Sequence, residues 1–163
     1  MAHRRFEFDM SAPADVVFDA FHFHHWRVKW DSLVRHTRVQ GDAPCPFAGA
    51  VTENQGRGLL RPLSMTTTFV SFDRPNVAAA TMVGQSFPFR RWAASIQHRR
   101  DSMERSCLIY SYTFEVGPTW IQWLLEPIVV RIFDWQTRRR FAKLQAYIQR
   151  HREEIERWQK AQA

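Results

Sequence analysis

The fold follows from residues 128–159, which read IVVRIFDWQTRRRFAKLQAYIQRHREEIERWQ. Mostly apolar side chains recur here at intervals of three and four, the spacing that aligns them along one face of an α-helix. They are Val130, Phe133, Thr137, Phe141, Leu144, Ile148, His151, Ile155 and Trp158. Pro127 precedes them, so we expect it to end or kink a short helix that begins near Thr119. The pattern predicts a long amphipathic C-terminal helix at about 128–159.

Most of the chain before this helix has the pattern of β-strands. Between His3 and Met10, apolar Phe6, Phe8 and Met10 alternate with charged residues, which is typical of a half-buried strand. Six more runs rich in apolar and β-branched residues are separated by Gly-, Pro- and Asp-containing turns. These predicted strands cover residues 34–40, 48–55, 63–72, 77–83, 89–99 and 105–116, with breaks that include 41–44, 56–58, 73–76 and 84–88.

Two short helices are expected between the first strand and the second. Residues 11–15 combine a hydroxyl, a proline and an acid in the order of a helix start, with Ser11 as the predicted cap. In residues 23–33, Trp26 and Trp30 are four positions apart and so lie on one side of a helix.

These elements predict an α+β fold. A long amphipathic helix that follows an antiparallel sheet must bury its apolar stripe on that sheet, and a sheet of this size twists and curls. We therefore expect a curved antiparallel sheet of about seven strands around the C-terminal helix, the helix-grip arrangement, with the two short helices after strand 1. Since the sequence has no repeat, linker or low-complexity segment, residues 1–163 are predicted to form one domain.

Composition excludes several classes of protein. With 45% hydrophobic and 14% aromatic residues, the chain is far from the composition of a disordered protein. It has neither an apolar run long enough to span a bilayer nor an apolar segment after the basic N-terminus. Cys45 and Cys107 have no metal or redox spacing, which favours free thiols in a reducing compartment. We therefore expect a cytoplasmic protein.

Several short sequence segments resemble those of the START-like superfamily, also called SRPBCC or polyketide cyclase/dehydrase and lipid-transport proteins. Ala12–Phe18 is similar to the start of the superfamily's first helix, which follows the first strand. Trp26 with Trp30-Asp31 is similar to its second helix. Phe72-Asp73-Arg74-Pro75 resembles its mid-sheet turn. Two further phrases resemble its penultimate strand and its closing helix: Arg105–Tyr112 and Arg138–Leu144. The superfamily includes lipid carriers, hormone receptors, polyketide aromatase/cyclases and ring-hydroxylase subunits, so the resemblance implies a cavity for an apolar ligand without specifying a function.

Candidate cavity residues are those expected to point inward. Pockets for small molecules are mainly apolar, with a few polar groups that fix orientation; Thr67, Tyr110, Tyr112 and Thr137 are candidates for that role, and any of the set could equally be plain core. The predicted opening lies near Trp26 and Trp30 and the loop at 84–88. The full set is Trp26, Trp30, Met65, Thr67, Phe69, Met82, Trp92, Ile96, Tyr110, Tyr112, Phe114, Phe133, Thr137 and Phe141.

Catalytic and metal chemistry have weaker support in the sequence. His22, His24 and His25 cluster, but their spacing matches no ligand pattern, and no metal or cofactor is expected. Glu53, His98 and Glu115 are the only strand residues to consider for acid–base work, and each fits an outward face equally well. No residue is therefore assigned a catalytic role.

The charge distribution suggests a second surface. The formal net charge is +7, and residues 131–160 hold nine Lys or Arg against four acids. Arg138, Arg139, Arg140 and Lys143 are predicted to form a basic surface, which could be a solvated helix face or could attract an anionic membrane; nucleic acid is disfavoured because no base-reading module accompanies it.

The sequence thus favours non-catalytic binding or carriage of a small hydrophobic molecule such as a lipid, isoprenoid or aromatic polyketide. A cyclase/aromatase-type enzyme and an interaction module that uses the basic helix remain as alternatives.

Overall fold

A computed structural model describes residues 1–56 and 64–162. The chain starts with β1 (Ala2–Met10) and two short helices, α1 (Ala14–His22) and α2 (His24–Trp30). Six strands follow: β2 (Val34–Val39), β3 (Val51–Gly56), β4 (Ser64–Asp73), β5 (Val77–Met82), β6 (Phe89–Arg100) and β7 (Ser106–Val116). A 3₁₀ turn, η2 (Thr119–Ile121), leads into α3 (Gln122–Gln162). Parts of two predicted features, the break at 56–58 and the strand start at Leu63, lie outside the described residues.

The seven strands form one antiparallel sheet in the order β1-β7-β6-β5-β4-β3-β2. Strands β2 to β7 are a meander, because each pairs with its neighbour in the sequence, and β1 adds to the far side of β7. Directly paired residues share a face, so Ile96 opposite Tyr110 and Trp92 opposite Phe114 place four large side chains on the inner side. The predicted α+β fold class is confirmed.

Helix α3 is longer than the sequence predicted. It starts at Gln122, six residues before the expected position, and Pro127 lies inside it. Proline removes the hydrogen bond to the carbonyl of residue i−4, which here is Trp123; because the Trp123 side chain is 78% exposed, this turn of the helix lies at the surface, where water can hydrate the carbonyl. Proline is therefore tolerated there and does not end the helix.

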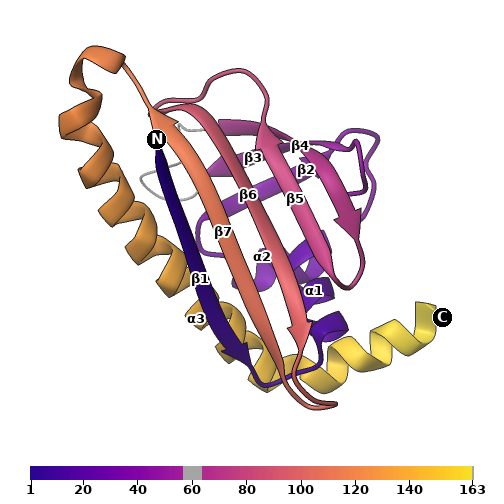
Figure 1. The fold of residues 1–163 in the computed structure, drawn as a ribbon. Coiled ribbons are helices and arrows are strands. Elements are labelled where there is room, and N and C mark those ends of the chain that lie inside the picture. The colour runs from indigo at the N-terminus through magenta and orange to yellow at the C-terminus, as the bar shows by residue number, and fades with distance from the viewer. Residues whose placement is uncertain (57–63, 163) are drawn as a thin grey trace.

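The apolar stripe of α3 divides into two parts. Its buried members, Thr137, Phe141, Leu144, Ile148 and Ile155, all lie at or after residue 137, in what we call the C-terminal part of the helix. Figure 1 shows α3 descending beside β1 and then curving below the sheet past α1 and α2. The sheet and the long helix that it holds define a helix-grip fold.

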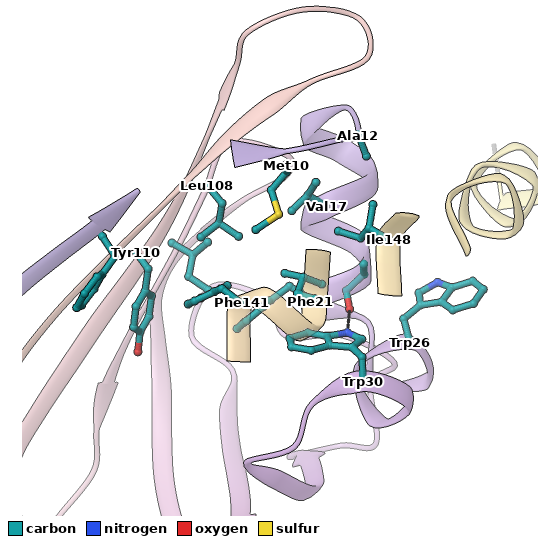
Figure 2. Packing of buried hydrophobic residues seen from close by; sticks show 14 of the residues in the cluster. Met10, Ala12, Val17, Phe21, Trp26, Trp30, Leu108, Tyr110, Phe141 and Ile148 are labelled. Carbon is teal, nitrogen blue, oxygen red and sulfur yellow. Dashed lines mark hydrogen bonds between the residues drawn. The ribbon is translucent and has the colours of Figure 1, made fainter. Parts of the chain in front are cut away.

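The core joins the C-terminal part of α3, from Thr137 onward, to β1, β7 and the two short helices. Phe141 stacks on Phe8 at 4.7 Å between ring centroids and lies 5.2 Å from Tyr110. Figure 2 shows Phe141 and Phe21 side by side in this cluster, with Trp30 beneath α1, where its indole N–H donates a 2.8 Å hydrogen bond to the Ala20 carbonyl. These contacts pack α1, α2 and α3 together as one unit.

The start of α1 differs in detail from the prediction. Pro13 is the residue before the helix, and no side chain caps it. The Ser11 hydroxyl instead accepts a hydrogen bond of 3.4 Å from the Gln149 amide on α3. Ser11 therefore links α3 to the chain before α1.

Truncation of Phe141 tests the role of this contact. Phe141→Ala should lower the free energy of unfolding by about 3–5 kcal/mol, because it removes a fully buried ring and leaves a cavity. Trp135→Ala, on the same helix but 58% exposed, is the matched control and should change stability little. Urea unfolding followed by circular dichroism measures both; equal losses would contradict the assignment of the core to the C-terminal part of α3.

Candidate functional site

A cavity of about 400 Å³ lies between the sheet and the first half of α3. Its apolar wall comes from the inner faces of β4 to β7, from Phe21 of α1 and from Val129, Ile132 and Phe133 of α3. Phe87 and Ile132 line it although their side chains are 71% and 52% exposed. The cavity therefore opens to solvent between the loop before β6 and α3.

One group of polar side chains lies on β3 and β4. The Thr52 and Thr67 hydroxyls are hydrogen-bonded at 2.7 Å, and the Asn54 amide donates to both at 3.4 Å. All three residues line the cavity. This group can orient a bound molecule, although its members already satisfy part of one another's hydrogen-bonding capacity.

A charged cluster lies at the end of the cavity nearest the core. Arg27 of α2 donates from Nε to Asp31 Oδ2 at 3.0 Å, and Arg140 of α3 donates from Nη2 to the same oxygen at 2.5 Å. The Leu33 amide donates to Asp31 Oδ1 at 3.0 Å. Although burial raises the pKa of Asp31, the Arg140 and Arg27 guanidiniums outweigh it and lower this pKa to about 2. Asp31 is therefore ionised and ties α2 to α3.

Tyr110 and His22 add two uncharged polar groups. Burial raises the pKa of Tyr110 to about 12, and its hydroxyl points away from the buried cluster (Figure 2). The His22 ring contacts the Phe18 carbonyl through Nδ1 at 2.9 Å; a carbonyl only accepts, so Nδ1 carries the proton and Nε2 has the free lone pair. Burial is the main cause that lowers the pKa of His22 well below 6.5. The imidazole is thus neutral and held in one tautomer.

The predicted cavity residues fall into two groups. Seven of them line the cavity: Met65, Thr67, Phe69, Trp92, Ile96, Tyr110 and Phe133. The other seven do not: Trp26, Trp30, Met82, Tyr112, Phe114, Thr137 and Phe141. Except for Met82, which is half-buried at the end of β5, these seven are buried in the protein.

The predicted opening shows the same division. Ser86, Phe87 and Pro88 of the predicted loop border the cavity, whereas Trp26 and Trp30 do not. Both tryptophans are buried, Trp26 against Trp158 of α3 and Trp30 against Phe21. The reason is that the end of α3 packs on Trp26 through Trp158, while α1 covers Trp30 through Phe21 and the Ala20 carbonyl.

The predicted basic surface needs one correction. Arg138 and Arg139 are exposed, and Lys143 is half-buried. Arg140 does not belong to this surface, since its side chain is only 12% exposed and pairs with Asp31. Successive helix residues are 100° apart, so Arg140 turns inward while Arg138 and Arg139 face water.

The residues considered for acid–base chemistry do not gather at the cavity. Glu53 is exposed, and Glu115 lies 3.9 Å from exposed Arg91. His98 is buried against the Phe18 ring, and burial lowers its pKa to about 4. Within residues 1–56 and 64–162, no group of three or more His, Cys, Asp or Glu could hold a metal ion.

Sequence reasoning missed the charged cluster and His22. Trp30-Asp31 and the Arg138–Arg140 run were both recognised as motifs, but nothing in their spacing pairs them across the 109 residues that separate Asp31 from Arg140. The sequence places His22 in a cluster with His24 and His25 and does not distinguish it from them. Its position at the end of a short apolar helix was the available signal for burial.

The fold and the cavity together define a START-like, or SRPBCC, protein. Residues 1–149 match the family described as polyketide cyclase / dehydrase and lipid transport, and the chain belongs to that family. Among curated proteins, none matches it in sequence.

Solved structures share the fold at low identity. A conserved protein from Geobacillus kaustophilus superposes with a TM-score of 0.72 at 12% identity, over 92% of this chain and 97% of that one. The di-domain ARO/CYC BexL from the BE-7585A biosynthetic pathway has a TM-score of 0.72 at 12% identity, over 91% of this chain and 47% of that one. A norcoclaurine synthase point mutant from Thalictrum flavum, in complex with a transition-state analogue, has a TM-score of 0.67 at 11% identity, over 93% of this chain and 96% of that one. At these identities the likeness shows the fold alone.

Asp31 provides a test of the charged cluster. Asp31→Asn leaves two guanidiniums without a buried counter-charge and should cost about 3–5 kcal/mol of stability; Asp42→Asn, which breaks the exposed pair with Arg38, should cost little.

The cluster also has a pH signature. Because the pKa of Asp31 is lowered to about 2, its contribution is complete above the unfolded value near 4 and is lost as the pH falls toward 2. In thermal melts from pH 7 to pH 2, the melting temperature of the wild type should fall as the solution becomes acid, and it should fall less in Asp31→Asn. Identical pH profiles would contradict the pairing.

Proposed function

We propose that this protein binds or carries a small, mainly apolar molecule in the cavity between the sheet and α3, without catalysing a reaction on it. The cavity itself carries the proposal: its volume falls within the roughly 300–1,000 Å³ of small-molecule sites, and its wall is mostly apolar with a few polar groups. The family's lipid-transport members and the aromatic wall of Phe69, Trp92 and Phe133 support a lipid, isoprenoid or aromatic polyketide as the class of ligand.

An enzyme of the cyclase/aromatase type is the alternative within this family. Its best candidate is His22, which presents a neutral nitrogen, together with the Tyr110 hydroxyl. The polyketide cyclase members of the family and the ARO/CYC structure favour this alternative. Against it, the described cavity wall offers no carboxylate to act with His22. If His22→Gln and Tyr110→Phe retained every activity found for the protein, the enzyme alternative would lose both candidates.

A neutral fluorescent probe, N-phenyl-1-naphthylamine, tests the binding proposal. We expect one molecule to bind per chain with blue-shifted emission, because the probe is apolar and aromatic like the cavity wall. Ala94→Trp fills the cavity and should weaken binding by about tenfold or more. Ala93→Trp, one residue away on the exposed face of β6, should bind like the wild type. Absent binding, or equal binding by both variants, would contradict the proposal.

A second proposal concerns the first half of α3: we propose that it rests on an anionic lipid bilayer. Leu124, Ile128, Ile132 and Trp135 follow at intervals of four, four and three, and so form an apolar stripe on the side of the helix away from the core. With Trp120 and Trp123, these side chains are between 46% and 78% exposed. Aliphatic residues with tryptophans and arginines beside them are typical of helices that lie in a membrane interface.

The charges beside this stripe favour a bilayer over a second copy of the chain. Both acids between residues 120 and 143 are paired with the N-terminal segment, Glu126 with the Met1 amine at 3.3 Å and Asp134 with Arg4 at 3.4 Å. Exposed Arg131, Arg138 and Arg139 remain, and a symmetric dimer would bring them together. Anionic lipid neutralises them. Within residues 1–56 and 64–162, no helix has the length and apolar character required to cross a bilayer, so the contact would be peripheral.

Vesicle flotation tests the bilayer contact. Binding to phosphatidylcholine vesicles with about 30% phosphatidylglycerol should exceed binding to neutral vesicles and should weaken with salt. Ile128→Glu should lose most of it, whereas Val70→Glu, at another exposed apolar position on β4, should retain it. Wild-type binding to duplex DNA but not to vesicles would instead support the nucleic-acid alternative, and a concentration-dependent dimer abolished by Ile128→Glu would support self-association.

A further inference from the structure

The cavity contains one positive charge that the protein does not neutralise. Arg27 and Arg140 share Asp31, and both guanidiniums line the cavity. No Asp or Glu is among the described residues of the cavity wall. Two cations and one anion leave a net charge of +1 in a place where all three side chains are at most 13% exposed.

Asp31 carries a single negative charge and cannot neutralise both arginines. One of its oxygens accepts from both guanidiniums and the other accepts from the Leu33 amide. The Nε–H group of Arg140 is buried and has no hydrogen-bond partner among the described residues. A buried N–H on a charged group that lacks a partner is costly, so the protein leaves both the charge and the hydrogen bonding of Arg140 incompletely satisfied.

The neighbouring groups do not supply an anion. Phe21 lies against both guanidiniums, at 5.1 Å from Arg27 and 4.9 Å from Arg140, but contributes only its ring. His22 is neutral because burial and neighbouring positive charges lower its pKa. Tyr110 keeps its proton because burial raises its pKa to about 12. The charge therefore faces an apolar cavity flanked by neutral polar groups.

We propose that the ligand is amphipathic and carries a compact anionic oxygen group, such as a carboxylate, which binds at Arg140 and Arg27 while its apolar body fills the cavity. This inference rests on the proposed function, since it specifies one end of the proposed ligand. The anion completes a neutral cluster of two arginines and two anions, and guanidinium–carboxylate hydrogen bonds are among the stronger ones in proteins. The aromatic wall at Phe69, Trp92 and Phe133 takes the apolar body.

A purely structural role for the cluster predicts a different behaviour. Arg140 joins α3 to the end of α2 through Asp31, and this link alone would stabilise the fold without affecting which ligand binds. The two roles separate in a comparison of ligands that differ by one charge. 8-Anilinonaphthalene-1-sulfonate is N-phenyl-1-naphthylamine with one added sulfonate, so the pair reports on the anion with the apolar body held constant.

Fluorescence titration of the intact chain with both probes is the experiment. We expect the wild type to bind the sulfonate at least about tenfold more tightly than the neutral probe at pH 8. Arg140→Gln should reduce this preference to within about twofold; because the preference is a ratio of two affinities of the same variant, a change in the affinity for the neutral probe does not affect the reading. Arg139→Gln, which changes the neighbouring exposed arginine, is the matched control and should keep the full preference. Arg140→Lys keeps the positive charge and should keep part of the preference for the sulfonate.

The outcomes distinguish the two proposals. If the wild type binds neither probe, the proposed function fails. If it binds both equally, the cavity exists as a binding site and only the anionic ligand is contradicted, a result that requires no variant to fold. If the sulfonate preference survives in both Arg140→Gln and Arg27→Gln but is lost in Arg139→Gln, the anion binds on the outer surface of α3, which also overturns the inference.

Discussion

The packing of Phe141 and the residues that follow it on α3 against β1, β7 and the short helices is the contact on which the rest of the structure depends. It anchors one half of a 41-residue helix. The other half is then held over the sheet at a distance, because α3 is supported at its far end and is linked there by Glu126 to the Met1 amine. The cavity is the space that this arrangement leaves open.

The same helix therefore has different roles along its length. From Thr137 onward its inward face is core. Before Thr137, Val129 and Phe133 form a cavity wall, while Ile128 and Trp135 point outward. Ile132 takes part in both the wall and the exposed stripe, so the mouth of the cavity adjoins the surface that we propose for a bilayer. A membrane-bound orientation would bring the opening close to a source of apolar ligand.

How much of this was predictable depends on the range of the interactions. Alternation in β4, β6 and β7 is a local property, and Thr67, Trp92 and Tyr110, which it predicts to point inward, line the cavity. Whether an inward residue meets core or cavity depends on where α3 crosses the sheet, which is why Tyr112 and Phe114 could not be separated from Tyr110. The sequence does not distinguish Arg140 from the other two arginines of its run, and its partner Asp31 is remote in sequence. The sequence did not predict that α3 begins at Gln122, because Pro127 was expected to end or kink a helix, whereas it is tolerated where water can reach the helix backbone.

The central claim is that the space between α3 and the sheet holds a ligand. A crystal structure of the protein in complex with the anionic probe tests it most directly. We expect density for the probe between Phe69, Trp92 and Phe133, with its sulfonate at Arg140. A structure in which the first half of α3 closes onto the sheet, fills this space with side chains and leaves the probe on the outer surface would contradict it.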